Sequence, residues 1–160
     1  MAKDVYQLLA EDHRVLFALV ERLKGTDRGW ERRRLLEEIS LELIPHAMAE
    51  EAVFYARLDE VGGALDEHAR MEELVSSLHE VADDGGTFEE RLGQLEQSLR
   101  EHTAREEQEL FEAARRRMDE VEAVRLAAEV SEAKQEVRGR LVHAAEQARL
   151  DRLGGRPASP

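Results

Sequence analysis

The sequence has 160 residues and a formal net charge of −13 at pH 7, with 37% charged and only 4% aromatic residues. This length suits one domain with a real core. An acidic chain is repelled by phosphate backbones and anionic lipid, so we expect a small-molecule or protein partner and neither nucleic acid nor membrane. No long apolar stretch occurs, and we expect a cytoplasmic protein. The chain has no cysteine, so any metal must bind through nitrogen and oxygen ligands.

The first two helical patterns are separated by a short turn. Asp4 and Gln7 form a capping box, and apolar residues then recur at helical spacing until Gly25. A second pattern runs from about residue 30 to about residue 59 and is closed by two glycines, Gly62 and Gly63.

Three further helical patterns follow. One begins near residue 66 and fades at about residue 83, and Thr87 with Glu90 predicts a capping box that opens the next, to about residue 118. Asp119 with Glu122 predicts the start of a fifth helix that reaches about residue 150. We therefore predict an all-α, up-down-up-down four-helix bundle with an additional C-terminal helix. Residues 1–150 form this bundle, with a metal site within 4–118, and residues 151–160 form a flexible tail.

Histidines occupy the apolar stripes of four helices. His13 follows Leu9 and precedes Leu16 and Val20 at steps of four, three and four, so it faces inward. Each of the other three stripes carries a histidine with a glutamate four residues later. These pairs are His46 with Glu50, His68 with Glu72, and His102 with Glu106.

Two interpretations of these pairs compete. A single pair is a common hydrogen bond on a wet helix face, and a metal-free helical interaction module would need nothing more. Three ionised carboxylates inside apolar stripes, however, cost several kcal/mol or more unless a positive charge compensates them. Helical bundles build di-metal sites from such inward side chains, so we favour a metal site.

The ordered set resembles the hemerythrin-like, or HHE cation-binding, domain family. The strings that carry the resemblance are Glu11-Asp12-His13, His46-Ala47-Met48-Ala49-Glu50-Glu51 and Glu101-His102-Thr103-Ala104-Arg105-Glu106-Glu107. The resemblance implies two iron ions joined by an oxo or hydroxo group, although manganese and zinc suit the same ligands. It also implies bridging carboxylates at Glu50 and Glu106, with one metal on His13 and His46 and the other on His68, Glu72 and His102.

Glu72 departs from the oxygen carriers of that family, which have a fifth histidine at this position. A carboxylate is a harder ligand and adds negative charge, so reversible oxygen carriage is put in doubt. We expect a di-iron protein that binds or reacts with oxygen, peroxide or nitric oxide, and the sequence leaves enzymatic turnover open. The alternative is a non-catalytic iron or oxygen sensor or an iron store. Tyr55 is expected to pack at the core edge. Glu51, Glu107 and Glu109 are expected to be solvated neighbours of the site, and a role in supporting its ligands is left open for them.

Overall fold

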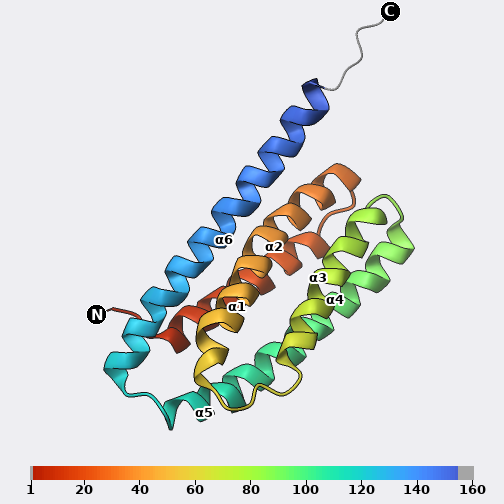
Figure 1. Ribbon diagram of the computed structural model, residues 1–160. Coiled ribbons are helices and arrows are strands. Elements are labelled where there is room, and N and C mark those ends of the chain that lie inside the picture. The colour runs from red at the N-terminus through yellow and green to blue at the C-terminus, as the bar shows by residue number, and fades with distance from the viewer. Residues whose placement is uncertain (1, 155–160) are drawn as a thin grey trace, which may run out of the picture.

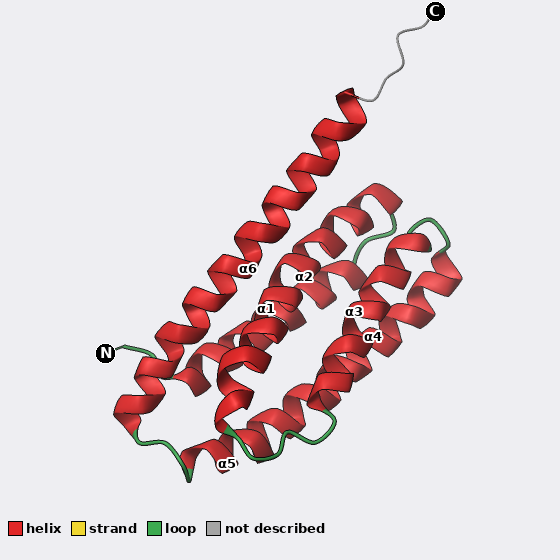
Figure 2. Ribbon diagram, in the orientation of Figure 1, coloured by secondary structure: helices red, strands yellow, loops and turns green. Residues whose placement is uncertain are grey.

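The computed structural model describes residues 2–154, and within them it contains helices and short connections but no strand (Figure 2). The principal helices are α1 (Val5–Lys24), α2 (Gly29–Ala49), α3 (Ala64–Glu80), α4 (Gly85–Arg105) and α6 (Glu120–Gly154), with a short α5 (Phe111–Arg115) before the last connection. None of these helices combines the length and the apolar run needed to cross a bilayer.

Helices α1 to α4 pack side by side as the bundle, and α6 lies against α1 and α2 (Figure 1). The C-terminal part of α6 projects beyond the bundle, and nearly all of its side chains after Val137 are exposed. The predicted all-α bundle with an additional C-terminal helix is therefore confirmed.

The ends of the helices follow the local sequence in two of three predicted cases. In α1 the N–H of Gln7 donates to Asp4 Oδ1 at 2.8 Å, which confirms that capping box. The N–H of Glu122 likewise donates to the side chain of Asp119 at 2.8 Å at the start of α6.

The capping box predicted at Thr87 is wrong. Helix α4 begins three residues earlier, with Asp84 rather than Thr87 as its N-cap, because the carboxylate of Asp84 accepts the backbone N–H of Thr87. At the other end of the chain, α6 continues through Gly154, past the predicted end near residue 150. Residues 155–160 of the predicted tail lie outside the described residues.

Two π-helical turns interrupt the regular helices. Helix α2 passes into the π turn η1 (Glu50–Phe54) and then into the 3₁₀ turn η2 (Tyr55–Arg57), and α4 passes into the π turn η3 (Glu106–Leu110). At both π turns the backbone N–H bonds to the carbonyl five residues earlier, from Tyr55 to Glu50 and from Phe111 to Glu106. Single π turns in α-helices are rare and frequently lie at functional sites.

Two apolar clusters fill the bundle, one toward each end. The first contains side chains from positions 16–23, 35–43, 71–78 and 88–99, and the second contains side chains from positions 5–9, 49–55, 64, 110–114 and 123–130. On each of the four bundle helices the stripe histidine lies between these segments. The buried histidines and glutamates thus form one polar layer between two apolar clusters.

Candidate metal centre

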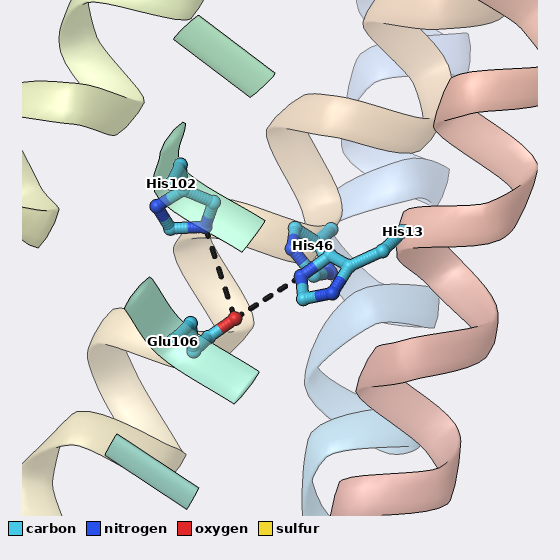
Figure 3. A group of neighbouring side chains, drawn as sticks. All are labelled: His13, His46, His102 and Glu106. Atoms are coloured by element: carbon cyan, nitrogen blue, oxygen red, sulfur yellow. Dashed lines mark ion pairs between the residues drawn. The ribbon is translucent and has the colours of Figure 1, made fainter. Parts of the chain in front are cut away.

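Six of the seven predicted ligands meet in this buried layer. The four histidines are each 1% exposed, and Glu50 and Glu106 are 0% exposed. Two sets of possible ligand atoms each lie within 4.8 Å of one another, and the first is drawn in Figure 3. The sets are His13, His46, His102 and Glu106, and His46, Glu50, His68 and His102.

Each glutamate lies between histidines from two helices. The two oxygens of Glu50 lie 3.3 Å from His46 Nε2 and 3.3 Å from His68 Nε2. One oxygen of Glu106 lies 3.0 Å from His13 Nε2 and 3.8 Å from His102 Nε2 (Figure 3). Both carboxylates therefore face two imidazoles at once.

Several of these buried atoms have no hydrogen-bond partner among the described residues. Although His13 Nε2 and Glu106 Oε2 lie close together, they are not aligned for a hydrogen bond, and His46 Nε2 and one oxygen of Glu50 are also without one. Buried polar atoms are almost always satisfied, because an unsatisfied one costs about 1–3 kcal/mol. Nitrogen and oxygen atoms that converge and remain unpaired fit a bound cation.

A second set of carboxylates holds the outer nitrogen of every histidine. An ionised carboxylate can only accept a hydrogen bond, so Nδ1 carries a proton, and Nε2 is the nitrogen whose lone pair a metal ion in the centre would use. The Nδ1 contacts are His13 with Glu107 at 2.8 Å, His46 with Asp12 at 3.3 Å, His68 with Glu51 at 2.8 Å, and His102 with Glu67 at 3.0 Å. Glu51 and Glu107, expected as solvated neighbours, thus orient the ligands.

The charges in the layer are unbalanced. Burial raises the pKa of Glu50, and the nearby charge of Glu106 raises it further. Burial alone would lower the pKa of His13, but the adjacent carboxylates of Glu106 and Glu107 raise it to about 10. A proton on His13 therefore offsets part of the negative charge, and a metal ion would compete with that proton for the ring.

Tyr55 belongs to the site, and the prediction that it packs at the core edge missed this. Its hydroxyl donates to Glu50 Oε2 at 3.3 Å, and its ring stacks on His68 with centroids 5.7 Å apart. Burial and the charges of Glu50 and Glu106 raise the pKa of Tyr55, so the hydroxyl stays protonated and acts as a donor. A regular helix would turn position 55 away from position 50, whereas the π turn stacks residues five apart.

Glu72 is the predicted ligand that the structure does not bring into either set. It is half-buried and lines a cavity of about 330 Å³ with Ser40, Leu43 and Ile44 among its other walls. Burial raises the pKa of Glu72, and the charge of Glu51 adds to this effect while His68 opposes it. Glu72 therefore lines that cavity and lies near enough to His68 and Glu51 for their charges to interact.

Comparison with known proteins points to one family. The fold matches that of a hemerythrin HHE cation binding domain-containing protein from Mycobacterium kansasii, with a TM-score of 0.77 and 21% identity over 88% of this chain and 91% of that one. A protein named DNA nickase from Nostoc sp. is 25% identical over 144 residues, which are 86% of this chain but only 41% of the relative. The hemerythrin HHE cation binding domain model matches residues 4–114. The matched segment contains all seven predicted ligands, and this chain belongs to the hemerythrin HHE cation-binding domain family.

Proposed function

We propose that this chain is a non-haem di-iron protein that binds or reacts with oxygen, peroxide or nitric oxide. The observation that carries the proposal is the layer of four imidazoles and two fully buried carboxylates, in which several converging inner atoms have no hydrogen-bond partner among the described residues. Two irons held there would supply redox chemistry and a coordination position for a small molecule.

The spacing of the rings supports the assignment of ligands to two metals. The centroids of His13 and His46 lie 5.1 Å apart and those of His68 and His102 lie 4.6 Å apart, whereas the cross pairs lie at 6.0 and 6.3 Å. We therefore assign one iron to His13 and His46 and the other to His68 and His102. Glu50 and Glu106, each of which faces one histidine of either pair, would bridge the two irons.

Other residues of the chain prepare this layer for chemistry. The apolar clusters on either side exclude bulk water, which strengthens electrostatic interactions inside the layer. Tyr55 holds one oxygen of Glu50 in place through its hydroxyl. Glu72 lines a cavity and lies near His68, and its predicted ligand role is tested below.

The activity named for the Nostoc relative is no guide to this chain. The chain spans less than half of that protein, and a net charge of −13 disfavours contact with a phosphate backbone.

Iron content and colour test the proposal. Protein loaded with ferrous iron without oxygen and then exposed to air should hold two irons per chain and gain near-ultraviolet and visible absorption. The His68→Ala variant should lose iron, and His79→Ala on the same helix should retain it, because His79 lies outside both ligand sets. A colourless wild type that holds no metal would contradict the proposal.

Two further measurements refine it. Glu72→Gln should keep both irons, and loss of iron from this variant would make Glu72 a ligand after all. Consumption of hydrogen peroxide by the iron-loaded wild type distinguishes an enzyme from an iron or oxygen sensor or a store, both of which would bind iron without turnover.

A further inference from the structure

Helix α6 reaches the metal centre through one side chain. Lys134 Nζ donates to Asp12 Oδ2 at 2.5 Å, and His46 Nδ1 lies 3.3 Å from the same oxygen. The side chains of Lys134 and Asp12 are only 18% and 15% exposed. Helix α6 lies beyond the family match at residues 4–114. A helix outside the matched segment therefore supplies a positive charge that reaches the candidate ligand His46 through Asp12.

A second histidine has the same arrangement. Arg105 Nη2 donates to Glu67 Oε2 at 2.8 Å, and His102 Nδ1 lies 3.0 Å from that oxygen. In both cases the cation and the imidazole share one oxygen atom, and the histidine contact is 3.0 Å or longer.

The other two histidines differ. The contacts of His13 with Glu107 and of His68 with Glu51 are both 2.8 Å. Within the described chain, no lysine or arginine lies within 4.0 Å of either of these carboxylates, whose side chains are 39% and 38% exposed. The longer histidine contacts thus coincide with a cation on the accepting oxygen.

The physical link is the charge on the accepting oxygen. A carboxylate that accepts from Nδ1–H makes the ring a stronger donor at Nε2, which is why such partners tune metal sites. An ammonium group on the same oxygen neutralises part of its charge and weakens its bond to the ring. The metal-facing nitrogen then donates less electron density.

We propose that Lys134 is a positioning residue that weakens electron donation from His46 by occupying the Asp12 oxygen that His46 also uses. The effect on a bound metal rests on the proposed function. The effect on the hydrogen bond between His46 and Asp12 exists in the metal-free chain as well. Helix α6 thereby sets the electronic properties of the centre that the bundle builds.

Lys134→Met is the test variant, because it keeps most of the side-chain volume and removes the charge. Arg138→Met is the matched control, since Arg138 also joins α6 to α2, through Glu42 and the carbonyl of Leu41, but does not contact the layer. Lys134→Arg keeps the positive charge and should therefore give the wild-type His46 resonance and iron affinity. This variant separates loss of charge from a general disturbance of folding.

The first measurement uses metal-free protein. In nitrogen–proton NMR spectra, the Nδ1 proton of His46 should move downfield in Lys134→Met, as its bond to Asp12 strengthens, and should not move in Arg138→Met. An unmoved resonance, or equal shifts in the two variants, would overturn the inference whether or not the chain binds iron.

The second measurement uses ferrous iron as the probe. Lys134→Met should bind iron about threefold to tenfold more tightly, a smaller effect than the roughly 10–100-fold that follows complete loss of a ligand's hydrogen-bond partner, and its reduction potential should fall. Unchanged or weaker binding relative to Arg138→Met would overturn the inference. A wild type that binds no iron would instead defeat the proposed function and leave the NMR result to decide the hydrogen bond.

Discussion

The bundle consists of two halves that build the centre in nearly the same way. The first half, from α1 to η2, has an acid directly before its first histidine, Asp12-His13, and the second half, from α3 to α5, has Glu67-His68 in the same place. Each half then supplies a second histidine, a buried glutamate at the start of a π turn and an adjacent glutamate that holds a histidine of the other half. These residues are His46, Glu50 and Glu51, and His102, Glu106 and Glu107.

The halves differ at two points close to the buried layer. Five residues after the buried glutamate the first half has Tyr55, whose hydroxyl binds Glu50, and the second half has Phe111, which has no hydroxyl. The cation on the outer carboxylate comes from α6 in the first half, as Lys134, and from α4 itself in the second, as Arg105. The scaffold is therefore close to symmetric, and a few side chains distinguish the two proposed metal positions.

The bridging carboxylates should show the largest effects. Glu50→Gln and Glu106→Gln each remove a charge that faces two imidazoles, so each should lower the iron content from two per chain to one or fewer. Elemental analysis measures this. Glu73→Gln, at an exposed position of α3, is the control and should keep both irons. If Glu50→Gln or Glu106→Gln retained two irons, the two carboxylates would not have equivalent roles in the two halves.

The tyrosine tests the difference between the halves. Tyr55→Phe makes the first half like the second and removes a hydrogen bond to a buried carboxylate, so the metal-free variant should lose about 1–3 kcal/mol in its free energy of unfolding. Denaturant unfolding measures this loss. Tyr6→Phe is the control, because the Tyr6 hydroxyl is buried without a partner among the described residues, so its removal should leave the free energy of unfolding unchanged or raise it. Equal losses of unfolding free energy in the two variants would show that the Tyr55 hydroxyl does not stabilise Glu50.

The second cation should act as the first does. Arg105→Met frees the Glu67 oxygen that His102 uses, so the Nδ1 proton of His102 should move downfield in NMR spectra. Because Arg105 and Lys134 contact different carboxylates, the double variant should shift the His46 and His102 resonances independently. If Arg105→Met shifted the His46 resonance, or Lys134→Met shifted the His102 resonance, the hydrogen bonds of the two halves would be coupled.

The helix caps should produce the smallest effect. Asp84→Ala removes the side-chain cap of α4 and should cost about 0.5–2 kcal/mol of stability without loss of iron. Arg28→Ala, at the N-cap of α2, removes a side chain that makes no capping hydrogen bond and should change stability little. Thermal unfolding of the two variants makes the comparison, and a lower iron content in Asp84→Ala would contradict the separation of cap and centre.

Regular helical periodicity was enough to predict the bundle and most of the layer. Steps of three and four placed all four histidines inward, and the glutamates Glu50 and Glu106 followed from the same spacing. Glu72 has that spacing from His68 as well, yet it lies half-buried outside both ligand sets. Spacing places a residue on a face of a helix, but it does not say how far the side chain reaches into the core.

Two other features required the structure. Tyr55 was misjudged because the π turn changes the angle between successive residues, and the paired glutamates followed by an aromatic residue in both halves were the signal available in the sequence. The contact of Lys134 with Asp12 joins positions 122 residues apart, and no local pattern predicts such a contact. Tertiary contacts of single polar side chains are set by packing rather than by periodicity.

The polar layer between the two apolar clusters also determines how the helices align along their length. Two apolar clusters alone would specify the alignment of the helices less strictly, since after a shift of one turn apolar side chains would again meet apolar side chains. Such a shift would separate each histidine from the carboxylate on the neighbouring helix and bury unpaired charge. The layer that costs the fold stability therefore selects a single native register for all four helices.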